Sequence, residues 1–254
     1  MSLPDLAGRR VVVTGGASGM GAAVVRAFPA LGARVVSMDR RDDEGKRVAG
    51  GSAATFVHCD VADEASVAAA FAAAEARLGG LDVLVHAAGV PAQVAAADTA
   101  LGQWDNVMSV NATGTFLVNR AAYPLLRESK GMILNFTSAA GIRGAAAWGA
   151  YSASKGAVLS WSRAIALEWA ADGIRVNCIA PAIATPMFES VRAAMSPDDL
   201  AAWDTQLKAA IPLRGRLGDA QEDLVPVLAF LSTRECKFVT GQIFCVDGGQ
   251  VMVR

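Results

Sequence analysis

Residues 10–21 read RVVVTGGASGMG, a β-branched run followed at once by a turn that holds four glycines. The run Arg10–Thr14 predicts a strand, and the alanine-rich segment Gly19–Leu31 predicts the helix after it. Glycines in such a turn permit a tight bend, a close approach of the backbone to a pyrophosphate, and contact between helix and strand. The helix would present the positive end of its dipole to those phosphates. The stretch therefore predicts a dinucleotide site, although a glycine-rich turn alone is a weak signal.

The second predicted strand, Arg34–Asp39, supports this interpretation because it ends in an acidic residue about 20 residues beyond the turn. Asp39 can accept hydrogen bonds from both hydroxyls of an adenosine ribose, and its charge would repel a 2′-phosphate. The sequence therefore favours NAD over NADP. Arg40 and Arg41 leave NADP open, since either could hold a phosphate if Asp39 turned away.

Short strand-like runs alternate with longer alanine-rich helical stretches, which is the pattern of a parallel sheet covered on both faces. No linker rich in Pro, Gly or Ser interrupts the alternation. We therefore expect an α/β fold, with one doubly wound domain over residues 1–254 and a seven-stranded parallel sheet flanked by helices. The expected strands are Arg10–Thr14, Arg34–Asp39, Thr55–Cys59, Leu81–His86, Met132–Thr137, Ile174–Ala180 and Gln242–Val246. The expected helices are Gly19–Leu31, Glu64–Leu78, Trp104–Arg127, Ala150–Ala171 and Ala220–Leu231.

The long stretch 181–218, which has no clear strand pattern, follows the sixth predicted strand. Ligands of open α/β sheets bind beyond the carboxyl ends of the strands, and connections of this length are usually functional or mobile. We expect a helical substrate loop over about 181–218. The alternative is a helical pair packed as ordinary core or as a contact between subunits.

The composition argues against several functional classes. The 254 residues carry a formal net charge of −1 and their charges are dispersed, which argues against nucleic acid or an anionic membrane as a partner. No apolar run reaches the roughly 18 residues of a membrane span, and the amino terminus lacks the pattern of a signal peptide. We expect a soluble, cytoplasmic protein.

The cysteines and histidines give no pattern of metal ligands. The four cysteines have no CxxC spacing and lie in or beside apolar segments, which predicts buried, reduced thiols. Both histidines lie in strand-like runs, so we expect no metal site. The residues concerned are Cys59, Cys178, Cys236, Cys245, His58 and His86.

The segment Tyr151-Ser152-Ala153-Ser154-Lys155 carries the clearest chemical pattern. Residues at i and i+4 share a helix face, so the Tyr151 hydroxyl and the Lys155 ammonium can approach one centre. A nearby cation favours the phenolate and would make tyrosine usable as a general acid or base. Ser138 ends the fifth predicted strand, at the same edge of the sheet as the start of the Tyr151 helix, so its hydroxyl could bond the reacting oxygen.

Together these segments resemble the short-chain dehydrogenase/reductase family over essentially the whole chain. Several ordered motifs at family spacing are far more specific than any one of them. The resemblance implies a Rossmann-type fold and an NAD(P)-dependent oxidoreductase that exchanges a hydride between nicotinamide and an alcohol or ketone. The residues that carry it are Thr14–Gly21, Asp60-Val61, His86-Ala87-Ala88-Gly89, Asn111, Ser138, Tyr151, Lys155 and Pro181–Thr185.

The resemblance also implies roles for four catalytic residues. Tyr151 would be the acid and base, and Ser138 would orient and polarise the substrate oxygen. Lys155 would bind the nicotinamide ribose and lower the pKa of Tyr151. Asn111 would hold a water that links Lys155 to solvent.

The cofactor contacts implied by the resemblance come from six segments. His86 is expected to bind through its backbone, and the segment after the sixth strand is expected to fix the nicotinamide carboxamide. His86 and Ala87 depart from the usual paired asparagines, and Ala182 replaces a glycine, which could alter the loop that orients the nicotinamide. The expected contacts are Gly15, Ser18, Gly19, Met20, Gly21, Asp39, Arg40, Asp60, Val61, His86, Ala88, Gly89, Tyr151, Lys155, Pro181, Ile183 and Thr185.

The expected substrate is a hydrophobic secondary alcohol or its ketone, because the residues near the predicted centre are mostly apolar. Ser138, Trp148 and Met187 are its expected contacts. By resemblance we expect a homotetramer, with a dimer as the alternative, and Trp161 and Trp169 are expected to contribute apolar surface to the contact. An NADPH-dependent ketoreductase is the main alternative function. A non-catalytic regulator that senses the dinucleotide is less favoured, because sensing needs no proton relay.

Overall fold

The computed structural model describes residues 4–193 and 195–253, without the side chains of Met187, Ser190 and Val191. Its centre is one seven-stranded sheet in the order β3-β2-β1-β4-β5-β6-β7, and every neighbouring pair is parallel. The predicted doubly wound α/β fold is confirmed, and each predicted strand is present to within two residues at either end. The strands are β1 (Arg10–Thr14), β2 (Arg34–Asp39), β3 (Thr55–His58), β4 (Val83–His86), β5 (Met132–Phe136), β6 (Arg175–Pro181) and β7 (Ile243–Val246).

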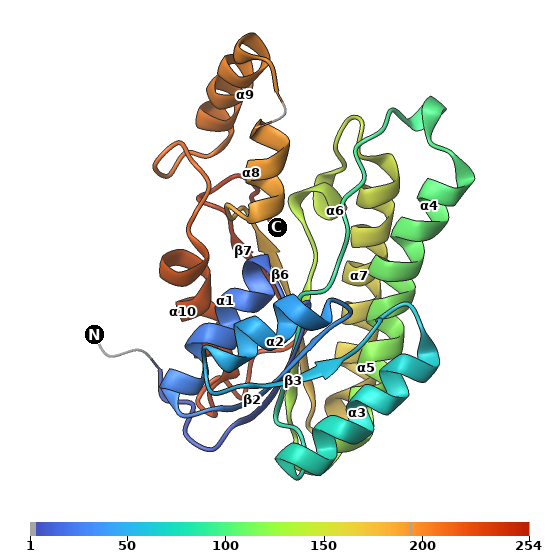
Figure 1. Cartoon of the computed structure of the whole chain (residues 1–254), viewed down its shortest axis with the longest axis vertical. Coiled ribbons are helices and arrows are strands. Elements are labelled where there is room, and N and C mark those ends of the chain that lie inside the picture. The colour runs from blue at the N-terminus through green and yellow to red at the C-terminus, as the bar shows by residue number, and fades with distance from the viewer. Residues whose placement is uncertain (1–3, 194, 254) are drawn as a thin grey trace.

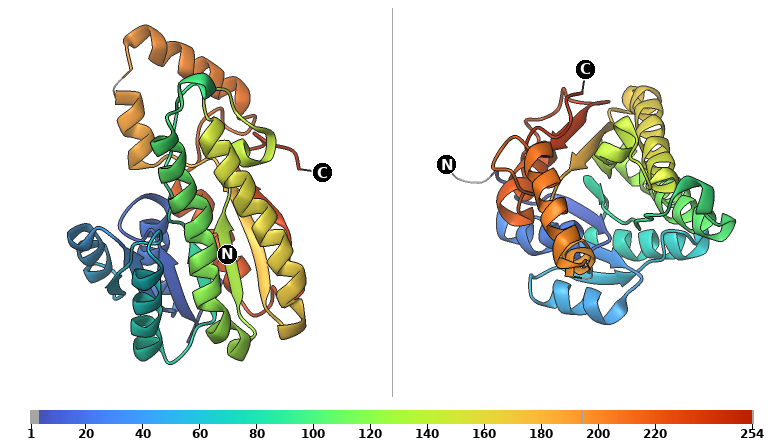
Figure 2. Two further views of the ribbon diagram at one scale, coloured as in Figure 1. Left: turned by 90° about the vertical axis from the view of Figure 1, so that its right-hand side faces the viewer. Right: turned by 90° about the horizontal axis from the view of Figure 1, so that it is seen from above.

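Helices cover both faces of the sheet (Figures 1 and 2). One face packs against α3, α5 and α7, and the other packs against α1, α2 and α10. The helices are α1 (Gly19–Ala27), α2 (Asp42–Gly50), α3 (Glu64–Leu78), α4 (Leu101–Met108), α5 (Gly114–Ser129), α6 (Ala139–Arg143), α7 (Gly149–Glu168), α8 (Pro186–Ala193), α9 (Pro197–Ala210) and α10 (Val225–Ser232). Short 3-10 turns lie at Pro29–Leu31, Ala96–Asp98 and Trp169–Asp172, and π-helical turns lie at Ser109–Thr113 and Ala220–Leu224.

The central strands are apolar without a break because both of their sides are covered. On β1, Val12 belongs to the core under α3, α5 and α7, and Val11 and Val13 belong to the core under α1 and α10. This is the period-two alternation of a strand, here with an apolar layer on each side. The β-branched run after Arg10 therefore lies in the middle of the molecule.

Several helical predictions need correction. The helix predicted over Ala150–Ala171 ends at Glu168 and continues as a 3-10 turn, and the one predicted over Ala220–Leu231 begins with a π-helical turn. The helix predicted over Trp104–Arg127 begins at Leu101 and is broken by the π-helical turn Ser109–Thr113. The helix predicted over Gly19–Leu31 ends at Ala27 and continues as a 3-10 turn, because Pro29 cannot donate the next backbone hydrogen bond. No helix was predicted at α2, which buries only Gly45, Val48 and Ala49 and therefore has a weak apolar pattern.

The residues expected at a subunit contact are placed differently from expectation. Trp169 is buried in the core beside Tyr123, with ring centroids 4.7 Å apart, and Trp161 packs edge-on against Phe116 at 5.4 Å. Trp169 faces inwards because α7 has already turned into the 3-10 segment at that point. Other large apolar side chains are exposed on these helices, namely Leu101 and Trp104 on α4 and Leu167 on α7.

All four cysteines are free, and Cys59, Cys178 and Cys236 are buried as predicted, whereas Cys245 is half-buried at the edge strand. Within the described part of the chain, no helix is both long and apolar enough to cross a bilayer.

Candidate active site

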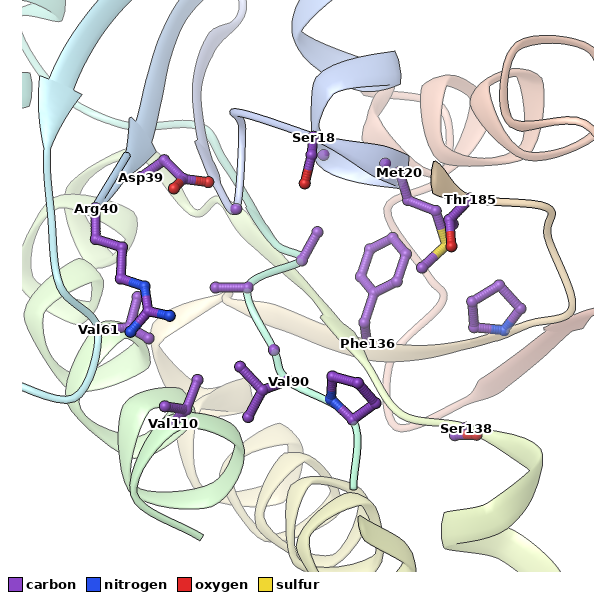
Figure 3. Close-up of a pocket in the computed structure, with 18 of the residues that line it drawn as sticks. Ser18, Met20, Asp39, Arg40, Val61, Val90, Val110, Phe136, Ser138 and Thr185 are labelled. Carbon is purple, nitrogen blue, oxygen red and sulfur yellow. The ribbon is translucent and has the colours of Figure 1, made fainter. Parts of the chain in front are cut away.

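A cavity of about 470 Å³ lies at the carboxyl ends of the central strands, where β1 and β4 lead their chains in opposite directions across the sheet. This reversal of strand order is the place where open α/β sheets bind ligands. Figure 3 shows the cavity with Asp39 and Arg40 at one end and Ser138 at the other. The lining also includes residues that were not predicted from the sequence, namely Cys59, Ala87, Pro91, Val110, Phe136, Thr137 and Pro186.

Most residues predicted for the site lie on the wall of this one cavity. The exceptions are Asn111, His86 and Trp148, which lie outside its lining, and Met187, whose side chain is outside the described residues. The predicted residues on the wall are Gly15, Ser18, Gly19, Met20, Gly21, Asp39, Arg40, Asp60, Val61, Ala88, Gly89, Ser138, Tyr151, Lys155, Pro181, Ile183 and Thr185.

The glycine-rich turn has the shape that the sequence predicted. Gly15 and Gly19 have φ angles of +70° and +53°, a region that favours glycine. A Cβ on Gly15 would lie 2.8 Å from the backbone nitrogen of Ala88, and one on Gly21 would lie 2.2 Å from the carbonyl oxygen of Gly15. By contrast, a Cβ on Gly19 would meet only Thr185, at 3.7 Å across the cavity. The turn is thus closely packed at Gly15 and Gly21 and open to the cavity at Gly19, which leaves room for a ligand against its backbone.

Asp39 is held at the end of β2 by backbone donors. Its Oδ2 accepts from the backbone N–H of Ala17 at 3.1 Å, and its Oδ1 accepts from the backbone N–H of Arg41 at 3.0 Å. The Arg41 guanidinium adds a bond to Asp39 at 3.3 Å and donates to Ser18 Oγ at 2.7 Å. Asp39 is buried and turned towards the turn, while Arg40 extends along the cavity (Figure 3). Asp39 and Arg41 therefore tie the end of β2 to the glycine-rich turn after β1.

Asp60, expected as a cofactor contact, also holds a turn of the backbone. Its Oδ1 accepts from the backbone N–H of Ala62 at 3.0 Å, so the carboxylate stabilises the turn before α3. The same residue lies on the cavity wall beside Val61.

The Tyr151–Lys155 pair lies on α7 with both side chains on the cavity wall, as the i and i+4 spacing predicts. Lys155 is buried, and its Nζ donates to the backbone oxygen of Phe136 at 2.7 Å and lies 5.9 Å from the centre of the Tyr151 ring. Ser138 is the N-cap of α6, where its Oγ accepts from the backbone N–H of Ala140 at 3.2 Å. Strand β5 and the residues just after it thus contribute both the carbonyl that holds Lys155 and the hydroxyl that faces Tyr151.

The pKa of Tyr151 does not fall, as would be expected for a phenol beside a cation. Burial raises the pKa of Tyr151, and a hydrogen bond with Ser138 offsets part of that rise. Burial also lowers the pKa of Lys155 to about 8. Lys155 donates its hydrogen bond to the Phe136 carbonyl rather than to the phenol, so desolvation dominates both groups. Tyr151 is consequently protonated at neutral pH.

Comparison with known proteins agrees with this geometry. Residues 15–250 match the family model described as enoyl-(acyl carrier protein) reductase. The chain is 39% identical over 251 residues to 3-alpha-(or 20-beta)-hydroxysteroid dehydrogenase of Mycobacterium tuberculosis, covering 97% of this chain and 90% of the relative. It is 37% identical over 255 residues to 2,5-dichloro-2,5-cyclohexadiene-1,4-diol dehydrogenase of Sphingobium indicum, covering 97% and 98%. The chain belongs to the short-chain dehydrogenase/reductase family.

Solved short-chain dehydrogenase/reductase structures have the same fold. A 3-ketoacyl-(acyl-carrier-protein) reductase from Brucella melitensis, complexed with NADH, superposes with a TM-score of 0.87 at 32% identity, over 97% of this chain and 99% of that one. A variant of the actinorhodin polyketide ketoreductase with NADPH superposes with a TM-score of 0.88 at 32% identity, over 95% and 97%. The family consists of oxidoreductases that use a nicotinamide dinucleotide, and its solved members include complexes of both kinds.

The fit of a dinucleotide to this short-chain dehydrogenase/reductase can be tested on its own residues. The open front of Gly19 at the N-terminus of α1 and the carboxylate of Asp39 both lie on the cavity wall, where they suit the phosphates and a ribose of the ligand. Gly89 lies opposite, where a Cβ would come within 3.3 Å of Lys155 Nζ. The residues present therefore fit the cofactor, and a side chain at Gly89 would crowd Lys155.

Asn111 lies just behind the catalytic wall, at the π-helical turn. Its Oδ1 accepts from the backbone N–H of Val90 at 2.8 Å, and its Nδ2 donates to the Val90 carbonyl at 2.9 Å and to Ser154 Oγ at 3.0 Å. Asn111, which falls inside the helix predicted over Trp104–Arg127, thus lies at a break in the regular helical hydrogen bonding. Its side chain joins the loop after β4 to α7.

Proposed function

We propose that this short-chain dehydrogenase/reductase interconverts a hydrophobic secondary alcohol and its ketone with NAD as the cofactor. The observation that carries the proposal is the placement of Tyr151, Ser138 and Lys155 at one end of a single cavity whose other end is Asp39. The first group of residues suits proton exchange with a reacting oxygen, and Asp39 suits an unphosphorylated ribose.

Bound nicotinamide would supply or accept the hydride. Tyr151 would give its phenolic proton to a ketone oxygen, or take the proton from an alcohol once the phenol is ionised. Ser138 would donate a hydrogen bond to the same oxygen and so hold it beside the phenol. Lys155, fixed by the Phe136 carbonyl, would place a positive charge near the ribose and the phenolate.

The preference for NAD rests on the hydrogen bonds of Asp39. Two backbone N–H groups hold its carboxylate in place, and rotating the side chain to admit a phosphate would break both bonds. The Arg41 guanidinium already donates hydrogen bonds to Asp39 and Ser18. A 2′-phosphate would therefore meet a fixed negative charge.

NADPH-dependent ketone reduction is the second candidate, and one observation favours it. Arg40 extends into the cavity as a possible partner for a phosphate. The solved actinorhodin ketoreductase, which contains NADPH, also has the same fold.

The substrate would lie between Tyr151 and the helices α8 and α9. Trp148 presents its ring to Tyr151 with centroids 5.5 Å apart at 65°, which suits a flat apolar substrate. Segment 181–218 leaves and rejoins the sheet at a backbone pair, in which Ala184 donates to Gly218 and Gly218 donates to Ala182, each at 2.9 Å. We infer that α8 and α9 form a substrate lid, and that these backbone hydrogen bonds hold the two ends of the lid segment together. Relatives named for hydroxysteroid and cyclohexadiene-diol substrates support a cyclic alcohol.

The exposed apolar residues on α4 and α7 support the expected homotetramer. Leu101 at the start of α4 and Leu167 near the end of α7 are 73% and 83% exposed, and both helices could contribute to a contact with another copy. Their burial against another copy would explain them. The mass of the purified protein in solution separates a tetramer from the alternative dimer.

Direct titration tests the cofactor proposal. The purified protein is titrated with NADH and with NADPH, and binding is followed by the fluorescence of the reduced nicotinamide. We expect tighter binding of NADH by at least about tenfold, which is the scale of one charge-assisted hydrogen bond. Tighter binding of NADPH would refute the role of Asp39 and favour the ketoreductase alternative.

A further inference from the structure

A buried chain of hydrogen bonds runs beneath the cavity, from the glycine-rich turn to Asn111. Its centre is His86, the last residue of β4, which is 2% exposed. One ring nitrogen, Nδ1, lies 2.7 Å from Thr14 Oγ1 at the end of β1, and the other, Nε2, lies 3.0 Å from Thr115 Oγ1 on α5. Thr115 Oγ1 in turn donates to the carbonyl oxygen of Asn111 at 2.6 Å.

The partners fix the direction of every bond in this chain. A carbonyl oxygen only accepts, so the single hydroxyl proton of Thr115 is committed to Asn111. Towards His86, Thr115 can then only accept, and Nε2 must carry a proton. A neutral imidazole has one N–H, so Nδ1 is bare and accepts from the hydroxyl of Thr14. Thr14 Oγ1 still accepts weakly from the backbone N–H of Ala88 at 3.4 Å.

The ring has strong reasons to stay neutral. Burial lowers the pKa of His86 to about 3, and the positive charge of Lys155 acts in the same direction. A second ring proton would also place two hydrogens between Nδ1 and the Thr14 hydroxyl. The directed chain is therefore stable across the neutral range of pH.

The end of the chain lies at the catalytic wall. Asn111 is in the π-helical turn Ser109–Thr113, where the regular helical hydrogen bonding is broken. The hydroxyl of Thr115, four residues later, donates to the backbone carbonyl of Asn111. The Asn111 side chain clamps both backbone groups of Val90 and bonds Ser154 on α7. Next to it, a Cβ at the Gly89 position would lie within 3.3 Å of Lys155 Nζ. Rotation of Asn111 would therefore move the wall against which Lys155 is placed.

We propose that His86 is a positioning residue, held as the neutral tautomer with its proton on Nε2, which acts with Thr115 to fix Asn111 and the cavity wall beside Lys155. This assigns a structural task to the side chain that stands where the family usually has asparagine. The consequence for turnover rests on the proposed function, whereas the tautomer and the clamp on Val90 do not.

The first experiment determines the tautomer. The chain has two histidines, so protein labelled with ¹⁵N-histidine gives two ring systems in a long-range proton–nitrogen correlation spectrum. His58 is exposed and pairs with Asp42 at 2.7 Å, and His58→Asn removes its signals and completes the assignment. We expect His86 to show a protonated Nε2 and a bare Nδ1 without titration between about pH 5 and 8. A protonated Nδ1, or titration of His86 within that range, would overturn the proposal.

The second experiment tests the positioning. Thr115→Val keeps the size of the side chain and removes the hydroxyl, and Thr115→Ser keeps the hydroxyl. Exchange of the Val90 amide with deuterium should be at least about tenfold faster in Thr115→Val and close to wild type in Thr115→Ser, because only the first variant removes the hydroxyl that holds the backbone carbonyl of Asn111. Equal exchange in wild type and Thr115→Val would refute the clamp.

The same variants separate the positioning from the proposed function. If the wild type turns over an alcohol, Thr115→Val should lower kcat by about tenfold, as expected for a slightly misplaced group, with NADH affinity within about twofold. Unchanged kcat alongside faster Val90 exchange would show that the clamp does not serve catalysis. A wild type without turnover would count against the proposed function, and the ring spectrum and the amide exchange would still decide the inference.

Discussion

The two ends of the cavity are built in different ways. At the dinucleotide end, the wall is backbone from β1, β2 and β4, and Asp39 is held by backbone N–H groups of the turn and of Arg41. At the other end, Ser138 and Tyr151 line the wall outside the sheet, and the helices α8 and α9 that follow Pro186 contact each other through side chains, such as Phe188 with Trp203 at 6.2 Å. The geometry of the dinucleotide end is therefore fixed by the sheet. The segments at the other end can change in sequence without disturbing the sheet.

The helices α8 and α9 illustrate the second kind of construction. They are joined by an ion pair between Arg192 and Asp204, and the Arg192 guanidinium lies 5.7 Å above the Phe188 ring. The indole nitrogen of Trp203 is buried without a hydrogen-bond partner in the described structure. These contacts hold the two helices to each other more than to the sheet.

The strongest effect of a substitution is expected at the end of the cavity that holds Tyr151. Tyr151→Phe removes only the phenolic proton donor, so turnover should fall by about a thousandfold while NADH affinity stays within about twofold. Tyr123→Phe is the matched control, because Tyr123 is the one other tyrosine and its hydroxyl bonds Asp172 at 2.7 Å, away from the cavity. Steady-state kinetics and NADH titration of both variants make the test. Turnover of Tyr151→Phe at the wild-type rate would remove Tyr151 from the reaction.

A second prediction concerns the stability contributed by Lys155. Burial lowers its pKa from 10.5 to about 8, so between these values the unfolded chain keeps a proton that the folded chain has released. Stability from this group therefore rises with pH across that window, by up to about 3 kcal/mol. Urea unfolding of wild type and Lys155→Met at several pH values gives the difference between the two proteins. A difference that stays flat from pH 8 to 10.5 would contradict the burial of a chargeable Lys155.

The third prediction concerns the dinucleotide end. Asp39→Ala removes the acceptor for the ribose hydroxyls and the charge that opposes a 2′-phosphate, so NADH should bind about tenfold more weakly and the preference over NADPH should disappear. Asp42→Ala is the control, since Asp42 is exposed and bonds His58 instead. Fluorescence titration measures both. An unchanged preference in Asp39→Ala would show that Arg40 or Arg41 selects the cofactor.

The weakest effect is expected at the substrate end. Trp148→Ala removes the ring that packs edge-on against Tyr151, so KM for a ring-bearing alcohol should rise about fivefold with little change in kcat. Trp148→Phe keeps an aromatic ring and should retain most of the affinity. If both variants match the wild type for every substrate tried, Trp148 only supports the fold.

The same difference between the two ends explains what could be predicted from the sequence. The strands and the turn follow from local patterns, since β-branched runs and positive-φ glycines act over a few residues. The helices α8 and α9 were expected only as a helical loop, because α9 buries none of its residues and so shows no clear apolar face, and α2 buries too little apolar surface to be recognised. The bond from Lys155 to the Phe136 carbonyl joins residues from two elements, so no local pattern contains it. For the same reason the sequence pattern predicts a lowered pKa for Tyr151, where burial raises it.

The proposed reaction is tested most simply by the reduction of NAD with a panel of hydrophobic secondary alcohols, followed by the absorbance of NADH. Wild type, Tyr151→Phe and Tyr123→Phe are compared, each with NAD and with NADP. We predict that at least one cyclic alcohol reduces NAD in the wild type and in Tyr123→Phe, that NADP reacts more slowly, and that Tyr151→Phe is inactive. Reduction at the wild-type rate in Tyr151→Phe, or faster reaction with NADP than with NAD, would contradict the proposed roles of Tyr151 and Asp39.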